Sequence, residues 1–153
     1  MKWYLAGPIC HVKDDSDRAW RDEAKKKLDY IDPFEEEVIG GHGDGESPKD
    51  RFNRLRTENK IGIVRQEMQE ILDIDFVAVL KADGVLAYSP EPSWGTIREC
   101  ALAHFLGKPV VIWTEAKGWD LANTLIGVST EIVDSLEEAI HACRRLEKEL
   151  VSY

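Results

Sequence analysis

Apolar and polar residues follow two patterns along the chain: short uninterrupted apolar runs, and longer stretches with helical spacing. The short runs are bounded by glycine, proline or charged residues, which is typical of strands buried in a parallel sheet. The acidic residues 35–37 are unfavourable for a strand at residues 32–39, the second of the expected strands. Five strands are expected, at residues 3–6, 32–39, 83–88, 110–113 and 131–133.

Between these runs, apolar residues recur every three to four positions, the spacing of an amphipathic helix. Gly107 and Pro109 are typical of a helix end, and Ser135 with Glu138 fits a capping box at a helix start. Helices are expected at residues 16–28, at 52–78 as one or two helices, at 94–106, and from residue 136 onward. The inward face of the last helix is expected to carry Leu136, Ile140, Cys143, Leu146 and Leu150.

Strands that alternate with helices predict a doubly wound α/β domain of the flavodoxin-like or Rossmann-like kind. We expect a five-stranded parallel sheet between two helical layers, a three-layer αβα sandwich. The 153 residues suit one domain over residues 1–153. Ligands of such folds bind outside the carboxyl ends of the strands. Three segments should therefore meet there: Gly7 with Pro8, residues 89–99, and the chain from Thr114 onward.

Composition narrows the functional classes. The formal net charge of -9 argues against duplex nucleic acid or an anionic membrane as a partner, because both call for a basic surface. No run approaches the roughly 18 apolar residues of a membrane span, and the first residues do not resemble a signal peptide. Cys10, Cys100 and Cys143 have neither disulfide nor zinc spacing, which favours reduced thiols in the cytoplasm.

The glycine-rich segment 40–48 is expected to be a loop, either a flap near the crevice or a plain surface loop. Its His42, with Asp44 and Glu46 nearby, has no second histidine or cysteine at ligand spacing. Neither a metal nor a cofactor is expected.

Glu99 is the main chemical question, because two interpretations fit its position. Thr96 and Glu99 have the spacing of a capping box, in which the glutamate reaches back to a backbone N–H. Alternatively, the helix begins at Ser93 or Trp94, and Glu99 lies in the second turn with its side chain directed toward the strand ends. There the carboxylate faces the crevice and is available for chemistry.

Four short motifs follow one another in order: Tyr4-Leu-Ala-Gly-Pro8, Asp75 with Asp83, Ser93-x-Gly-Thr-x-x-Glu99, and Gly107-Lys-Pro109. Together with segments 121–126 and 133–139, they resemble the nucleoside 2-deoxyribosyltransferases and the related 2′-deoxynucleoside 5′-monophosphate N-glycosidases. The resemblance covers most of the chain, although segments 35–37 and 40–48 have no counterpart in it.

The resemblance implies an enzyme that cleaves the N-glycosidic bond of 2′-deoxynucleosides or deoxynucleotides. Glu99 would be the nucleophile that attacks C1′ and forms a glycosyl-enzyme intermediate. Tyr4 would orient the Glu99 carboxylate, unless it is a core aromatic residue. Asp75 would bind and protonate the leaving base, with Asp73 as a rival and a solvated helix carboxylate as the alternative. Asp83 is expected to anchor the third strand.

The substrate-binding residues implied by the resemblance are Gly7, Pro8, Ile9, Ser93, Gly95 and Asn123. Transferases typically carry aspartate at the position of Ser93, where it meets the sugar 5′-hydroxyl, whereas the glycosidases carry serine. Serine at a helix start suits a 5′-phosphate, unless it only caps the helix. Asn123 resembles an asparagine that transferases lend to a neighbouring subunit. That implies a homo-oligomer, a dimer or larger, with shared active sites.

The expected partners are therefore a small nucleoside or nucleotide and a nucleobase. Transfer of deoxyribose to another base ranks first, and hydrolysis of a nucleoside 5′-monophosphate by water ranks second. A nucleotide-binding module without turnover is the remoter alternative.

Overall fold

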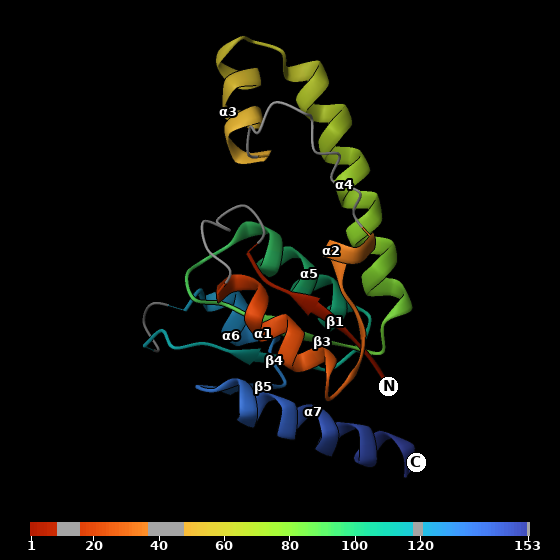
Figure 1. Cartoon of the computed structure of the whole chain (residues 1–153). Helices are drawn as coiled ribbons and strands as arrows, with labels where there is room; N and C mark the ends of the chain where they lie inside the picture. Colours follow the sequence, from red (N-terminus) through yellow and green to blue (C-terminus); the bar gives the residue numbers. More distant parts are fainter. Residues whose placement is uncertain (9–15, 37–47, 118–120, 153) are drawn as a thin grey trace.

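The computed structural model describes residues 1–8, 16–36, 48–117 and 121–152 (Figure 1). Its strands are β1 (Lys2–Ala6), β2 (Asp29–Ile31), β3 (Gly84–Tyr88), β4 (Val110–Trp113) and β5 (Glu131–Val133). Its helices are α1 (Ser16–Lys25), α2 (Pro33–Glu36), α3 (Pro48–Thr57), α4 (Ile61–Lys81), α5 (Trp94–Phe105), α6 (Asn123–Val128) and α7 (Leu136–Val151).

The strands form one parallel sheet in the order β2-β1-β3-β4-β5, which confirms the doubly wound fold. Tyr4 of β1 pairs with Val85 of β3, and Ala6 pairs with Ala87. The chain winds from β1 outward to β2 and then returns to β3 on the other side of β1. The carboxyl ends of β1 and β3 therefore flank the position where ligands bind in such sheets.

Two layers of helices cover the sheet, and alternate residues of β1 point into the two layers. Tyr4 and Ala6 belong to a buried cluster with residues of α4, α5 and α6. Trp3 and Leu5 belong to a second cluster with residues of α1 and α7. Tyr4 is thus directed toward the side of the sheet that carries Glu99.

Most predicted elements are confirmed, but the second strand is wrong. The strand β2 lies before Asp32, and Pro33 begins the short helix α2 instead. Proline has a fixed φ and no N–H, so it fits the first turn of a helix better than the interior of a sheet. The region predicted as one or two helices forms two, α3 and α4, and α6 was not predicted. Leu150, expected to face inward, is 52% exposed near the end of α7.

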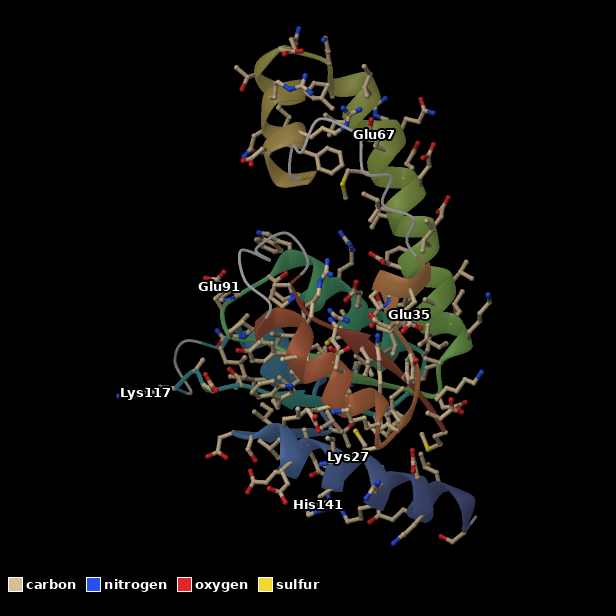
Figure 2. The ribbon with its side chains drawn as sticks, in the orientation of Figure 1. Lys27, Glu35, Glu67, Glu91, Lys117 and His141 are labelled. Carbon is tan, nitrogen blue, oxygen red and sulfur yellow. The ribbon has the colours of Figure 1, made fainter. Side chains whose placement is uncertain are left out.

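The helices α3 and the first half of α4 form a hairpin that stands away from the sheet (Figure 1). Asn59 makes the turn with a φ of 57°, a conformation that asparagine tolerates better than most residues. Inside the hairpin, the Arg51 guanidinium binds both carboxylate oxygens of Glu67 at 3.1 and 2.5 Å. Figure 2 shows Glu67 on the half of α4 that lies beside α3.

The second half of α4 returns to the sheet and buries Asp75, Ala78 and Val79. Lys108 holds its end: the ammonium donates to the carbonyl oxygens of Val79, Leu80 and Ala82 at 3.0, 2.7 and 2.5 Å. A cation at this end also opposes the partial negative charge of the helix C-terminus.

Asp83 anchors the start of β3, as predicted. Its Oδ2 accepts a hydrogen bond of 2.7 Å from the Lys2 N–H, and its own N–H donates to the Lys2 carbonyl at 2.7 Å.

Candidate active site

Tyr4, Asp75 and Glu99 come from three elements and meet inside the molecule. The Tyr4 hydroxyl lies 3.1 Å from Glu99 Oε1 and 3.5 Å from Asp75 Oδ1, with donor geometry to both. The three side chains are buried, with residue exposures of 0% for Tyr4, 3% for Asp75 and 5% for Glu99. We call these residues the carboxylate cluster. The three candidate catalytic residues predicted from sequence are therefore neighbours.

The structure places Asp75, and not its rival Asp73, beside Tyr4. Asp73 is exposed on α4, whereas Asp75, two positions later, is buried against the sheet. Residues two apart on a helix point in different directions, so only one of them reaches Tyr4.

Glu99 does not act in a capping box with Thr96. The helix α5 begins at Trp94 with Ser93 as its N-cap, so Glu99 lies in the second turn. The Thr96 hydroxyl is buried without a hydrogen-bond partner in the described part of the chain, and the Glu99 carboxylate accepts from Tyr4. The position of Glu99 thus favours the interpretation in which the carboxylate is available for chemistry.

Burial and the neighbouring charge of Asp75 raise the pKa of Glu99 to about 8. The hydrogen bond from Tyr4 and the positive charges of Arg98 and Arg21 act in the opposite direction. The pKa of Tyr4 is raised far above its usual range, first by burial and then by Glu99 and Asp75. Tyr4 therefore remains a neutral phenol that donates a hydrogen bond, while Glu99 titrates near neutral pH.

Two arginines near the carboxylate cluster were not predicted from the sequence. Arg98 precedes Glu99 on α5, and its guanidinium lies 3.7 Å from Asp75 Oδ2. It also lies 5.9 Å from the centre of the Phe76 ring, within the range of a cation–π contact. Adjacent residues on a helix do not face the same way, so its position next to Glu99 in the sequence did not predict this contact.

Arg21 of α1 is the second. It is 1% exposed, and its guanidinium donates to the Leu5 carbonyl, to Gly7 O at 3.3 Å and to Asp32 Oδ1 at 3.2 Å. No spacing rule predicts the contact between Arg21 and Asp32, because a turn and the strand β2 separate α1 from Asp32. The signal in the sequence was an arginine beside Trp20, at the border of the apolar face of the helix.

Of the predicted substrate-binding residues, Gly7 and Pro8 directly follow β1, as expected. A Cβ on Gly7 would come within 3.1 Å of the Trp20 ring and 3.2 Å of the Arg21 guanidinium, so the tight packing there favours glycine. A Cβ on Gly95 would make only ordinary contacts, at 3.9 Å from the Ser93 hydroxyl and 4.0 Å from Arg98.

The remaining three predicted binding residues are Ser93, Asn123 and Ile9, and the structure describes the first two. Ser93 occupies the N-cap position of α5, but its side chain makes no capping hydrogen bond. Asn123 is exposed at the start of α6 and has no hydrogen bond to the carboxylate cluster in the described part of the chain. Ile9 lies outside the described residues, as do His42 and segment 40–47.

A pocket of about 650 Å³ lies elsewhere, at the edge of the sheet between α6 and α7. Thr114, Ile126, Ile132, His141 and Arg145 contribute to its lining, and no residue of the carboxylate cluster does. Size alone therefore does not identify the reactive site, and the buried, mutually bonded ionisable groups are the stronger indication.

Within the described residues, no group of three or more histidine, cysteine, aspartate or glutamate side chains is arranged to hold a metal ion. The same part of the chain contains no helix with the length and apolar character of a membrane span.

Comparisons with known proteins agree with this fold. No protein-family model matches the chain, and no curated protein matches it in sequence. A conserved protein from Enterococcus faecalis V583 is similar in structure, with a TM-score of 0.61, 17% identity, and coverage of 95% of this chain and 98% of the other.

Two further structures are similar to the chain. For a 2-deoxyribosyltransferase from Bacillus psychrosaccharolyticus, the TM-score is 0.55 at 15% identity, covering 92% of this chain and 90% of the other. For a CMP N-glycosidase from Clostridium botulinum, the TM-score is 0.51 at 16% identity, covering 94% and 98%. At these identities the likeness establishes a shared fold, and the resemblance expected from the motifs is confirmed at that level.

Proposed function

We propose that the protein cleaves the N-glycosidic bond of a 2′-deoxynucleoside or deoxynucleotide, with Glu99 as the nucleophile. The observation that carries this is the buried contact of the Glu99 carboxylate with the Tyr4 hydroxyl, beside Asp75. A deoxyribosyltransferase and an N-glycosidase share the fold, which supports this class of reaction.

In the first step, the ionised Glu99 attacks C1′ of the sugar through an oxocarbenium-like transition state. The C1′–N bond breaks, and its electron pair leaves with the base, which takes up a proton. Asp75 is the proposed proton donor because it shares the Tyr4 hydroxyl with Glu99 and is shielded from water. A retaining mechanism needs its two carboxyl groups about 5–5.5 Å apart, and a shared hydroxyl keeps them close.

In the second step, an acceptor attacks the glycosyl-Glu99 ester from the opposite side and releases the carboxylate. We rank a second nucleobase first as the acceptor. Its N–H proton passes to the ionised Asp75, which restores the starting state. Tyr4 holds the Glu99 carboxylate in place in both steps, since its raised pKa keeps it protonated.

Water as the acceptor is the second candidate, and Ser93 favours it. The Ser93 hydroxyl stands at the start of α5 without a capping bond, which leaves it available to a substrate oxygen. Serine and the backbone N–H groups of a helix start suit a 5′-phosphate, the group that CMP carries. The structural neighbour named as a CMP N-glycosidase supports this possibility.

One experiment separates these candidates. The protein is mixed with each deoxynucleoside and each deoxynucleoside 5′-monophosphate, with and without a free acceptor base, and the products are followed by chromatography. Exchange that requires acceptor base supports transfer. Base release from monophosphates without acceptor supports hydrolysis, and saturable binding with no product in any mixture contradicts both.

We further propose that the protein is a homo-oligomer and that Asn123 of α6 contributes to a neighbouring subunit's site. Most of the exposed large apolar side chains among the described residues belong to α4, to α5 with the residue after it, and to α6. They are Ile61, Ile63, Ile74, Val77, Leu80, Trp94, Phe105, Leu106 and Ile126. Where such side chains lie together, they are typical of a surface that a partner covers.

We also propose a location in the cytoplasm, which the two cysteines in the described part of the chain support. Cys100 and Cys143 are free and buried, and burial raises the pKa of both thiols above the usual range. Such thiols are inert core residues and need no oxidising compartment.

A further inference from the structure

Arg98 is held only loosely beside the carboxylate cluster. Its ion pair with Asp75 Oδ2 measures 3.7 Å, longer than a hydrogen bond between charged groups, which is typically about 2.7–2.9 Å. Its Nε is buried and has no hydrogen-bond partner in the described part of the chain. The Phe76 ring lies 5.9 Å from the guanidinium, near the outer limit of a cation–π contact. The side chain is 34% exposed, so a ligand can reach it.

The guanidinium also faces the start of α5. The point at which a Cβ on Gly95 would lie is 4.0 Å from Arg98 Nη2 and 3.9 Å from the Ser93 hydroxyl. Because Gly95 has no side chain, nothing of this residue fills the space between the two groups. One oxyanion at this point is therefore within reach of both.

Other polar groups of the same turn also lack partners. The N–H groups in the first turn of a helix have no acceptor within the helix, and Ser93 makes no capping hydrogen bond. The Thr96 hydroxyl is in a residue that is 1% exposed, and it has no hydrogen-bond partner among the described residues. Buried polar groups normally find a partner, so the start of α5 has the hydrogen-bonding capacity of a ligand site.

The contact between Arg98 and Asp75 conflicts with the proposed chemistry. Asp75 is the proposed proton donor to the leaving base, and a donor has to hold its proton until that step. A neighbouring guanidinium favours the ionised form of a carboxyl group, whereas a neighbouring carboxylate such as Glu99 disfavours it. The guanidinium therefore has to leave Asp75 when substrate binds, and an anionic group on the substrate is the chemical means of drawing it away.

We propose that Arg98 selects a substrate with a 5′-phosphate: the phosphate binds between Ser93 and Arg98 and draws the guanidinium away from Asp75, which then keeps the proton for the base. This rests on the proposed function, which places C1′ of the sugar at Glu99. Ser93 lies six residues before Glu99, about 9 Å along α5, a distance that a deoxyribose and its 5′-phosphate can span. The proposal concerns the substrate and not the acceptor.

The first test measures binding without turnover. The four common 2′-deoxynucleosides and their 5′-monophosphates are titrated into Glu99→Gln protein by calorimetry. For each base, the ratio of the two dissociation constants gives the phosphate preference. In this background, Arg98→Met removes the guanidinium and Arg98→Lys keeps a cation. The matched control is Arg65→Met, which removes the same charge from an exposed position on the projecting half of α4.

We expect the monophosphate to bind about 10- to 100-fold more tightly than its nucleoside, and Arg98→Met to reduce this preference about tenfold. Arg98→Lys should keep most of it, because an ammonium also binds phosphate, and Arg65→Met should keep all of it. Ser93→Asp places a negative charge at the same point and should remove the preference. Asp75→Asn removes the carboxylate that competes for Arg98 and should increase it.

A second measurement does not depend on whether Arg98→Met folds. The Arg98 Nε–H signal is observed by NMR in nitrogen-labelled Glu99→Gln protein and identified by its absence in Arg98→Lys. It should shift when a deoxynucleoside monophosphate is added and stay in place with the nucleoside. A signal that the monophosphate does not move would contradict a direct contact.

Equal affinity for nucleosides and monophosphates, or no binding of either, overturns the proposal. A preference that Arg98→Met leaves intact, or that Arg65→Met lowers equally, does the same. If Asp75→Asn does not raise the preference, the exchange of Arg98 between Asp75 and phosphate is wrong. If the preference depends on Arg98 but the unaltered protein releases no base from any of these compounds, the proposed function fails and the phosphate site stands.

Discussion

At the scale of single residues, the Tyr4 hydroxyl lies between two carboxyl groups that come from α4 and α5. This arrangement gives Glu99 a raised pKa and a fixed orientation at the same time, since burial and Asp75 act on its charge and Tyr4 acts on its position. When the pKa of a buried carboxyl group is raised in the folded protein, ionisation of that group lowers the free energy of unfolding.

Glu99→Gln should therefore change how stability depends on pH. Because the folded protein holds the Glu99 proton up to a pKa of about 8 and the unfolded chain releases it near 4.5, ionisation lowers the free energy of unfolding as pH rises between these values. The variant lacks this effect. We therefore expect the free energy of unfolding of Glu99→Gln, relative to that of the unaltered protein, to rise by about 2–4 kcal/mol between pH 4 and pH 9. Urea unfolding at both pH values measures this, and an equal difference at both would contradict the raised pKa.

Tyr4→Phe should slow base release about ten- to a hundredfold, because a hydrogen bond to a charged group contributes about 1.5–3 kcal/mol. It should also raise the pKa of Glu99, since the bond from Tyr4 favours the carboxylate. Initial rates by chromatography measure the effect. Tyr30→Phe is the matched control, because the Tyr30 hydroxyl donates to the exposed carboxylate of Glu35, at 3.4 Å, away from the carboxylate cluster. Equal rates for the two variants would exclude Tyr4 from the reaction.

At the scale of elements, the apolar runs predicted the central strands because strands buried on both faces need apolar residues at every position. The edge strand β2 was misplaced, since its sequence Asp-Tyr-Ile is too short to show a pattern. The six-residue helix α6 was missed for the same reason. The motifs predicted which residues meet at Tyr4, but Arg21 and Arg98 were missed because their contacts depend on how α1 and α5 pack on the sheet.

Lys108→Met should loosen the helix that carries Asp75. The Lys108 ammonium binds three carbonyl oxygens at the end of α4, and without it these acceptors lose their charged partner. We expect a loss of about 1–3 kcal/mol in the free energy of unfolding, visible as a lower Tm. Lys148→Met, an exposed lysine of α7, is the control. If both variants melt alike, Lys108 does not hold α4.

At the scale of the whole molecule, the two faces of the sandwich differ in their surfaces. The α4–α5–α6 side exposes apolar side chains and carries both carboxyl groups of the site, so a subunit that covered this side, as proposed, would lie close to the chemistry. The projecting hairpin of α3 and α4 extends the same side (Figure 1).

Phe105→Ser should weaken self-association. Phe105 is 85% exposed at the end of α5, and burying it against another subunit would contribute about 1.5–3 kcal/mol. Sedimentation across protein concentrations should show a larger monomer fraction than in the unaltered protein. Leu150→Ser, which removes an exposed side chain on the α1–α7 side, should leave the distribution unchanged. A monomer at all concentrations before any substitution would contradict the oligomer.

The most direct measurement of the central claim is mass spectrometry of the protein after acid quenching during reaction with a deoxynucleoside or its monophosphate. We predict a deoxyribosyl adduct on the peptide that contains Glu99, lost when acceptor base is added and absent in Glu99→Gln. Base release at the same rate by Glu99→Gln, or an adduct on a different peptide, would contradict the assignment of Glu99 as the nucleophile.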